Sequence, residues 1–370
     1  MKVLIVYASS GSGHWKAAEA LHEILKERRG LEVSLVDSLQ YTTPRFRWSY
    51  PRTYIFLVRY LPSVWGFFYG ILDHPLLRTL VAKTRRILNG SNGAPLVAYL
   101  KREQPEVILS THFFASEIAG TLKQKGLLRS RLYTVITDFG IHGVWVNEGT
   151  DGYFVGSDAL KALLQERGVS PERIHLAGIP VHPKFEAKKD RQTLAGSLGL
   201  HPALFTVLVA SGGFGVGPIE HLVKALASYP SLQLLVVCGR NERLFRALSA
   251  KRFPGRIHLF HFVDNMDELM TVSDCMIGKS GGLTMSEALM KRLPTLILFP
   301  IPGQEDANRL FFTEQGAALS MNSLCEVEKR FRDFEGLKQQ LQQIQRRLEA
   351  LSFEGSGRRI VALALGEKDG

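Results

Sequence analysis

The 370-residue sequence predicts an α/β protein of two domains, each with a parallel β-sheet covered by helices on both faces. Short apolar runs with strand character alternate with helical segments along most of the chain. The runs form two series, and a polar stretch that contains prolines, Pro183 to Pro202, separates them. A chain of this length also fits two domains of ordinary size.

The first series of apolar runs begins almost at the first residue. Val3–Tyr7 has the composition of a buried strand, and a Gly/Ser turn and a helix around residues 17–21 follow it. We therefore expect the first domain to span residues 1–185. The later runs of this series are Val33–Val36, Val107–Leu109, Leu132–Ile136, Tyr153–Val155 and Ile174–Leu176.

The second series predicts a second sheet within residues 186–336. Helical segments such as Pro218–Ser228 and Leu283–Met290 lie between its strands. After it, Leu337–Leu351 is a strong helix former rich in Gln, Leu and Arg. The runs of this series are Phe205–Ala210, Leu232–Val237, Ile257–Phe262, Cys275–Ile277 and Thr295–Phe299.

Composition and charge limit the class of the protein. Apolar residues make up 45% and charged residues 22% of the chain, which excludes disordered, collagen-like and low-complexity classes. The formal net charge of +11 favours an acidic partner such as nucleic acid, anionic lipid or a phosphorylated substrate. Three scattered cysteines are too few for a disulfide framework or a structural zinc site, so we expect a reducing, cytosolic compartment.

The longest apolar stretch, Thr53 to Leu72, is interrupted by Arg59 and Pro62, so a membrane-spanning helix is not expected there. The N-terminus also lacks the long apolar core of a signal peptide. We expect a soluble or peripheral protein.

The positive charge is concentrated in one window. Residues 45–131 hold 14 basic and four acidic side chains, an excess of +10, and residues 46–69 hold ten aromatics. Rings and arginines together suit a membrane interface, although a helical hairpin whose rings fill the core and a surface that stacks single-stranded nucleic acid are the alternatives. The candidate membrane contacts are Arg45, Arg47, Trp48, Arg52, Arg59, Trp65, Phe67 and Phe68.

The loops that follow the strands are the candidate sites, because parallel sheets bind ligands beyond the carboxyl ends of their strands. In the first loop, Gly11 and Gly13 let the backbone approach a phosphate or an acceptor, and His14 stands at the start of the next helix. His14 is a candidate general base, since imidazole titrates near neutral pH; an ordinary helix cap is the alternative. Asp138, after the strand at residues 132–136, is a candidate site carboxylate.

Three loops of the second series suit a sugar nucleotide. A Gly-rich loop, residues 211–217, precedes a helix and has the character of a phosphate cradle. The densest motif is residues 278–289, where Gly281 and Gly282 open a helix and Glu287 follows in its second turn. The amides there can hold a diphosphate while Glu287 accepts hydrogen bonds from a ribose diol. The polar turn at residues 302–308 can read sugar hydroxyls.

Five motifs together carry a resemblance to a known family. They are Gly-Ser-Gly-His near the N-terminus, Thr-Asp-Phe followed by His142 and Trp145, Gly-Ile-Pro-Val at 178–181, Ser-Gly-Gly-Leu-Thr-Met-Ser-Glu-Ala at 280–288, and Pro-Gly-Gln-Glu at 302–305. In this order and spacing the chain resembles the monogalactosyldiacylglycerol synthase and processive diacylglycerol glucosyltransferase family, of glycosyltransferase family 28. That family is related to the lipid-linked N-acetylglucosaminyltransferase of bacterial cell-wall synthesis. The resemblance runs from Met1 to about Ser352.

The resemblance implies a GT-B fold, with two Rossmann-like domains whose parallel sheets face each other across a cleft. Residues 1–185 would bind the lipid acceptor and the membrane, residues 186–336 the UDP-sugar, and residues 337–370 would cross back to the first domain. Ser280 and Ser12 depart from the family pattern, which weakens any inference about the sugar. By motif, the donor-binding residues would be Gly213 and Gly215 beside the diphosphate, Val263 at the uracil, Gly281 and Gly282 at the diphosphate, Glu287 at the ribose, and Gln304 and Glu305 at the sugar.

The implied reaction is an inverting transfer of glucose or galactose from a UDP-sugar to the hydroxyl of 1,2-diacylglycerol. His14, oriented by Asp138, would be the catalytic base. The chain has no Asp-x-Asp triplet, so no metal or cofactor is expected. We expect a peripheral protein at the cytoplasmic face of an anionic membrane, without a nucleic-acid partner. The oligomeric state stays open, and so do three alternative functions: a UDP-GlcNAc-dependent transferase to a lipid-linked cell-wall precursor, a UDP-sugar 2-epimerase and a non-catalytic UDP-sugar sensor.

Overall fold

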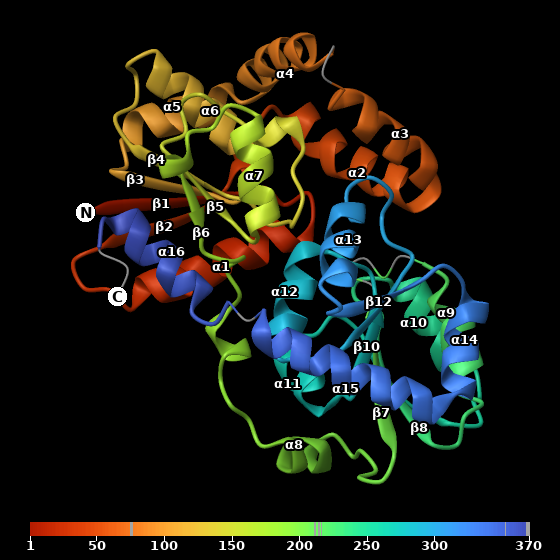
Figure 1. The fold of residues 1–370 in the computed structure, drawn as a ribbon. Coiled ribbons are helices and arrows are strands. Elements are labelled where there is room, and N and C mark those ends of the chain that lie inside the picture. The colour runs from red at the N-terminus through yellow and green to blue at the C-terminus, as the bar shows by residue number, and fades with distance from the viewer. Residues whose placement is uncertain (75–76, 211, 214, 216, 352, 368–370) are drawn as a thin grey trace. The chain divides into compact units, whose positions relative to one another are not determined.

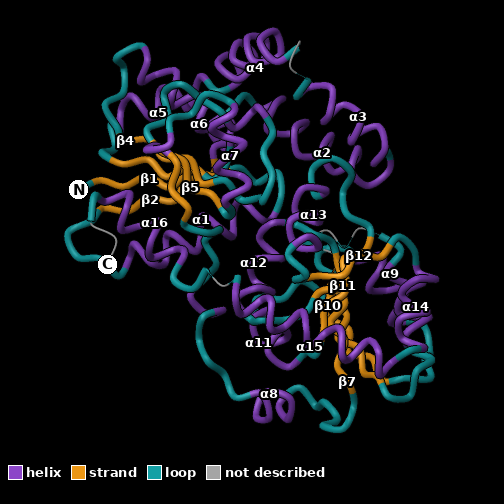
Figure 2. The backbone as a smooth tube through the Cα atoms, in the orientation of Figure 1, coloured by secondary structure: helices purple, strands orange, loops and turns teal. Residues whose placement is uncertain are grey.

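The computed structural model describes residues 1–74, 77–210, 212–213, 215, 217–351 and 353–367. Contacts between Cα atoms divide the chain into two units. Unit 1 comprises residues 1–183, 302–307 and 355–370, and unit 2 comprises residues 184–301 and 308–354. Each unit contains one of the two sheets in Figure 2.

Unit 1 is built on a six-stranded parallel sheet with helices on its faces (Figures 1 and 2). The strand order is β2-β1-β3-β4-β5-β6. All six expected apolar runs form strands here, because each is a short apolar segment bounded by turn residues. The strands are β1 (Lys2–Tyr7), β2 (Glu32–Asp37), β3 (Val107–Ser110), β4 (Arg131–Val135), β5 (Gly152–Val155) and β6 (Ile174–Leu176).

The alternation of side chains along β1 builds two core layers. Val3 and Ile5 pack in one buried cluster with residues of α1 and α16, whereas Leu4 and Val6 pack in another with residues of α5 and α6. The helices of unit 1 are α1 (Ser12–Lys26), α2 (Pro44–Tyr60), α3 (Pro62–Leu72), α4 (Arg78–Asn92), α5 (Ala94–Glu103), α6 (Phe113–Gln124), α7 (Asp158–Glu166) and α16 (Ser356–Leu365).

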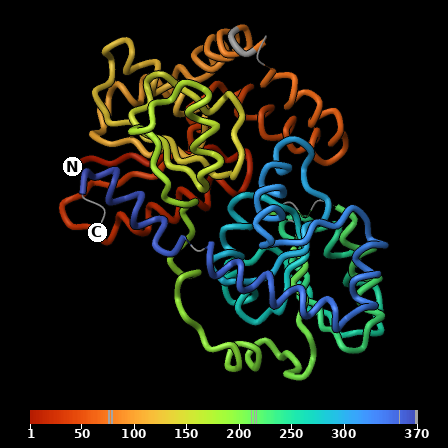
Figure 3. The backbone as a smooth tube through the Cα atoms, viewed as in Figure 1, coloured from red at the N-terminus to blue at the C-terminus, as the bar shows by residue number. Residues whose placement is uncertain are grey.

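The chain returns to unit 1 at its C-terminal end. Figure 3 shows the blue C-terminal helix α16 beside the red helix α1. Gly357 lies against α1, since a Cβ atom there would lie 2.5 Å from Cδ1 of Ile24, the flexible end of that side chain. The returning segment begins at residue 355, later than the expected residue 337, because α15 belongs to unit 2.

Unit 2 holds the second six-stranded parallel sheet, in the order β12-β11-β10-β7-β8-β9. Five of its strands are expected from apolar runs: β7 (Phe205–Ala210), β8 (Leu232–Val237), β9 (Arg256–Phe260), β10 (Cys275–Gly278) and β11 (Thr295–Leu298). The sixth strand, β12 (Ala318–Met321), was not expected. The remaining helices are α8 (Arg191–Ser197), α9 (Ile219–Leu226), α10 (Glu242–Ser249), α11 (Met266–Val272), α12 (Gly282–Met290), α13 (Asp306–Glu314), α14 (Leu324–Arg332) and α15 (Phe334–Ala350).

Helices α2 and α3 form a bent pair, which we call the aromatic hairpin (residues 44–72). The two helices are bent by 117° at a break next to Pro62, which begins α3. Within the described residues, no single helix has both the length and the apolar character needed to cross a bilayer, and only this bent pair passes that test jointly.

Candidate functional site

The candidate base lies where three neighbouring strands of unit 1 end. His14 is in the first turn of α1, after β1; His112 follows β3; and Thr137 and Asp138 follow β4. The three strands are adjacent in the sheet, in the order β1-β3-β4, so their carboxyl ends bring these side chains together.

Contacts with three side chains hold the imidazole of His14. Its Nδ1 atom lies 3.0 Å from Oγ1 of Thr137, within hydrogen-bonding distance. The ring of His112 meets it edge to face, with 4.7 Å between the ring centroids. The ring of Trp145 lies 5.9 Å away. Asp138 is the expected orienting group, and its neighbour Thr137 makes the hydrogen-bonding contact at Nδ1.

The environment keeps His14 neutral. Burial lowers the pKa of His14 to about 4, although a backbone hydrogen bond with Thr111 opposes the shift. A neutral imidazole is the form that accepts a proton. If Nδ1–H donates to Thr137, the lone pair on Nε2 is the available base.

His112 and Thr137 were not singled out from the sequence. His112 is 2% exposed, and burial lowers its pKa well below the usual value. The backbone N–H of Phe114 donates to Nδ1 of His112 (3.2 Å), so the ring proton of the neutral form is on Nε2. Thr137 directly follows an expected strand and stands in the Thr-Asp-Phe motif, whereas His112 lies three residues after the expected strand Val107–Leu109, and these were the sequence signals that could have found them.

The phenol of Tyr54 contacts Gln304 and is influenced by the charges of Asp138 and Glu305. The Tyr54 hydroxyl donates to Oε1 of Gln304 at 3.0 Å. Burial is the main cause that raises the pKa of Tyr54, and the charges of Glu305 and Asp138 raise it further. The segment 302–307, which contains Gln304 and Glu305, belongs to unit 1. It lies outside the range 186–336 that was expected to form the UDP-sugar domain.

The aromatic hairpin presents its rings on two different faces. Trp48 and Phe67 are 63% and 65% exposed, and Phe68 is also exposed. Trp65 departs from the expectation, because it is half-buried between Tyr54 and Tyr69, with ring centroids 5.3 and 6.0 Å away. The four candidate arginines, Arg45, Arg47, Arg52 and Arg59, are exposed.

In unit 2, the start of α12 can receive an anion. Gly281 is the N-cap of this helix and supplies no side-chain hydrogen bond, and the first turn has no acidic residue. The first backbone N–H groups of α12 are thus not capped by a side chain of Gly281, and Gly282 is buried at the helix start. Glu287 follows in the second turn and is half-buried.

The described part of the Gly-rich loop is tied to the end of β8. The N–H of Arg240 donates to O of Gly213 (2.9 Å), and Nδ2 of Asn241 donates to O of Gly215 (2.9 Å). Gly215 has φ +53°, and a Cβ atom there would clash with O of Cys238, so glycine is required. Residues 211, 214 and 216 of this loop lie outside the described residues.

The candidate donor residues of unit 2 lie at one edge of its sheet. Val263 follows β9, Gly213 and Gly215 follow β7, and Gly281 follows β10. These loops come after the carboxyl ends of parallel strands, the usual position for a nucleotide.

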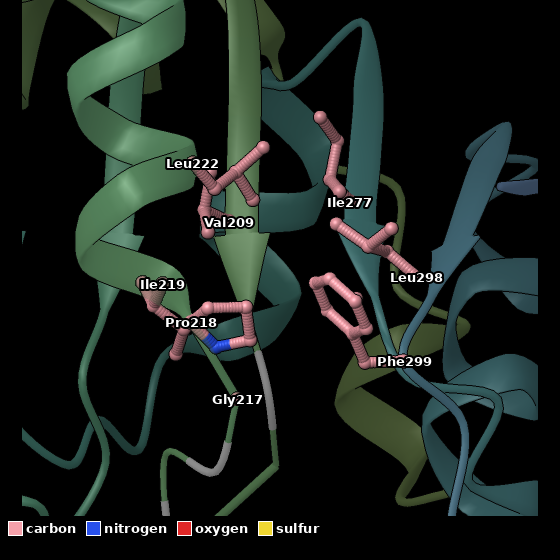
Figure 4. Close-up of a pocket in the computed structure, with 9 residues that line it drawn as sticks. Val209, Gly217, Pro218, Ile219, Leu222, Ile277, Leu298 and Phe299 are labelled. Carbon is pink, nitrogen blue, oxygen red and sulfur yellow. The ribbon is translucent and has the colours of Figure 1, made fainter. Parts of the chain in front are cut away.

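An apolar pocket lies at the same edge (Figure 4). It encloses about 280 Å³ of empty space, part of it open to solvent. Val209, Ile277, Leu298 and Phe299 line it beside Pro218. The described side chains that line it are apolar and do not hydrogen-bond a phosphate or a sugar.

Two family profiles match most of the chain. Residues 14–181 match monogalactosyldiacylglycerol (MGDG) synthase. Residues 206–354 match the glycosyltransferase family 28 C-terminal domain. The boundary between the matches, at residues 181–206, coincides with the polar stretch between the two series of strands.

Curated relatives cover nearly the whole chain. A processive diacylglycerol beta-glucosyltransferase of Bacillus cereus (strain B4264) is 31% identical over 334 residues, which are 88% of this chain and 83% of the relative. The same name is carried by a protein of Bacillus mycoides (strain KBAB4), with 31% identity and the same coverage.

Solved structures share the fold at low identity. MurG of Acinetobacter baumannii superposes with a TM-score of 0.63 at 15% identity over 99% of both chains. The MnaA–UDP complex of S. aureus gives 0.64 at 15% identity over the full length of both. UDP-GlcNAc 2-epimerase from Neisseria meningitidis gives 0.60 at 13% identity, covering 99% of this chain and 100% of that one. These similarities confirm the predicted two-domain α/β fold of the GT-B type.

Proposed function

We propose a function from one premise: the chain belongs to the family of monogalactosyldiacylglycerol synthases and processive diacylglycerol β-glucosyltransferases. On that premise it is a UDP-sugar-dependent hexosyltransferase that acts on 1,2-diacylglycerol. The observation that carries the proposal beyond family membership is the neutral, partly buried His14 at the junction of three strand ends.

The chemistry assigned to this site is an inverting transfer. The lipid hydroxyl attacks the anomeric carbon of the UDP-α-sugar, the bond from that carbon to the diphosphate oxygen breaks, and UDP leaves. Nε2 of His14 takes the proton of the attacking hydroxyl, and the product is a β-glycosyldiacylglycerol. Thr137 supports this role by holding Nδ1 at 3.0 Å.

The leaving diphosphate gains negative charge as the bond breaks. We assign its binding to the N-terminus of α12 at Gly281 and Gly282 and to the loop at Gly213 and Gly215, because helix N-termini and glycine-rich backbones favour anions. We expect no requirement for a metal ion. Glu287 is assigned to the ribose diol, since a carboxylate accepts two hydrogen bonds.

The sugar and the uracil have separate assignments. Gln304 and Glu305 would read sugar hydroxyls, and Glu305 is 6% exposed, so its carboxylate is held in place. The backbone at Val263 would bind the uracil. Asp138, whose charge acts on the same phenol as that of Glu305, is assigned to orient the base.

The acceptor is a membrane lipid, so we propose that the protein docks peripherally on the cytoplasmic face of an anionic membrane. The exposed rings Trp48, Phe67 and Phe68 and the exposed arginines of the hairpin support this. Rings enter the headgroup region while arginines meet lipid phosphates.

One labelling experiment tests the proposed reaction. UDP-glucose, UDP-galactose and UDP-GlcNAc, each radiolabelled in the sugar, are incubated separately with diacylglycerol vesicles, and both the extracted lipids and the aqueous sugar nucleotides are analysed. We expect label in the lipid phase, lost in His14→Ala. Label that stays in the aqueous phase, with conversion of UDP-GlcNAc to its C2 epimer, would replace the proposal by an epimerase. UDP-sugar binding without turnover would indicate a sensor.

A further inference from the structure

We propose that Tyr54 is a positioning residue, which fixes the side-chain amide of Gln304 so that its N–H groups are presented to the donor sugar. The inference rests on the proposed function, because it takes Gln304 as a sugar contact. It adds a residue of the aromatic hairpin to the recognition of the sugar.

The hydrogen bond from Tyr54 decides what Gln304 can offer. The Tyr54 hydroxyl donates to Oε1 of Gln304 at 3.0 Å. A glutamine amide has one acceptor oxygen and two N–H donors on its nitrogen. With the oxygen engaged by the phenol, Nε2 points away from it and its donors remain for a sugar hydroxyl oxygen.

Burial and the charges of Glu305 and Asp138 keep the Tyr54 phenol protonated, so that it remains the donor to Gln304. Glu305, 6% exposed, is next in the chain and offers only acceptor oxygens when ionised. Burial and the charges of Glu305 and Asp138 raise the pKa of Tyr54 above its usual value, so the phenol stays protonated and remains a donor. A fixed donor at Gln304 beside a fixed acceptor at Glu305 can distinguish the orientation of neighbouring hydroxyls.

Close packing holds the hairpin against the segment that carries Gln304. A Cβ atom at Gly66 would lie 2.9 Å from Cβ of Pro302. A Cβ atom at Gly303, where φ is +77°, would lie 3.0 Å from Cδ1 of Tyr69. Glycine at both positions therefore permits the approach. Trp65 braces the ring of Tyr54 from the side in a T-shaped contact, with 5.3 Å between ring centroids.

The end of α3 is anchored to the rest of unit 1. Arg167 donates two hydrogen bonds to the carboxylate of Asp73, at 3.0 and 2.7 Å, and the N–H of Gly143 donates a third at 2.7 Å. Nε2 of His142 donates to O of Tyr69 at 2.9 Å. These contacts tie α3 to the loop after β4 and to the end of α7. The ring of Trp65 in the anchored α3 in turn supports Tyr54 in α2.

Tyr54→Phe tests the hydroxyl alone, and Tyr50→Phe is its matched control. Tyr50 lies one helical turn earlier in α2, and its ring stacks on Phe46 at 5.0 Å between centroids. Burial raises the pKa of Tyr50 to about 12, so the control also removes a shielded hydroxyl. The dissociation constants of UDP, UDP-glucose and UDP-galactose are measured by calorimetry on each full-length variant, with thermal unfolding as a check of folding.

We expect Tyr54→Phe to raise the dissociation constant of the preferred UDP-sugar about three- to tenfold. The difference in affinity between UDP-glucose and UDP-galactose should become smaller, and the dissociation constant of UDP should not change. Tyr50→Phe should change none of these constants. In a Gln304→Ala background, Tyr54→Phe should have no further effect, because the two residues act through one contact.

Two outcomes would overturn the inference. If Tyr54→Phe binds UDP-sugars with unchanged affinity, the Tyr54 hydroxyl does not position Gln304. If the variant binds UDP and UDP-sugars with equally reduced affinity, Tyr54 has a general structural role. The proposed transferase function can fail independently of this inference. If the wild-type protein binds UDP-sugars but labels no lipid, the binding comparison between Tyr54→Phe and Tyr50→Phe is still valid. A wild-type protein that binds no UDP-sugar overturns both.

Discussion

Nδ1 of His14 and Oγ1 of Thr137 are 3.0 Å apart, and this pair links the end of β4 to the first turn of α1. The contact fixes the imidazole, and its other nitrogen can act as the base. Because the threonine follows a strand at the centre of the sheet, its position is set by the backbone.

Removing the base should affect turnover more than nucleotide binding. We expect His14→Ala to lower kcat by ~10²–10⁴-fold with little change in the Kd of UDP. Thr137→Val keeps the shape but loses the oxygen, and should lower kcat about tenfold, the effect of one hydrogen bond. A kcat above about a tenth of wild type in His14→Ala would move the role of base to another residue such as Asp138.

The pH dependence of turnover should show the low pKa of His14. The reactive form is the neutral imidazole, and burial lowers the pKa to about 4, so this form is present above pH 4 and is lost as pH falls through it. We expect kcat to be nearly constant from pH 8 to about pH 5. An acid limb centred near the ordinary imidazole pKa of about 6.5 would contradict the assignment.

The sequence was sufficient for most of the fold, since apolar runs of three to six residues bounded by turns mark buried parallel strands. It was insufficient for β12, whose residues Ala318–Met321 have no β-branched or aromatic side chain and whose two central residues are only half-buried at the sheet edge. Edge strands bury less surface, so their apolar signal is weaker.

The site was predictable only where a residue type carried its own signal. Gly281, Glu287 and His14 stand in motifs that indicate their chemistry, whereas Thr137, although it belongs to the Thr-Asp-Phe motif, acquires its role from a contact with His14, 123 positions away in sequence. The orientation of Trp65 was also unpredictable, because the bend next to Pro62 breaks the helical periodicity that would assign rings to a face.

Glu287 should matter for the nucleotide. A carboxylate that accepts two ribose hydroxyls contributes about 2–3 kcal/mol, so Glu287→Ala should raise the KM of the UDP-sugar at least about tenfold. Glu287→Gln keeps an acceptor oxygen and should have a smaller effect. A donor KM that is unchanged in the folded alanine variant would remove Glu287 from the site.

Transfer should not depend on a divalent cation. Since backbone amides and the N-terminus of α12 are assigned to the diphosphate, activity should survive excess EDTA. The measurement is lipid labelling with and without the chelator, followed by added magnesium or manganese. Loss on chelation that either metal restores would contradict the leaving-group assignment.

The exposed face of the aromatic hairpin should bind anionic membranes. Each basic residue near such a surface contributes about 1 kcal/mol, and salt screens this attraction over a Debye length of about 10 Å at 0.1 M. We therefore expect co-sedimentation with phosphatidylglycerol vesicles, weakened at high salt, and little binding to neutral vesicles.

Replacement of Trp48, Phe67 and Phe68 by Ser tests the rings themselves, because all three are at least 52% exposed. We expect weaker vesicle binding with an unchanged thermal transition. The matched control replaces three exposed leucines outside the hairpin, Leu127, Leu163 and Leu310, and should bind vesicles like the wild type. Loss of the thermal transition in the ring variant would show that these rings stabilise the fold. Equal loss of binding in both variants would show that docking responds to exposed apolar area in general, and that the hairpin has no special role.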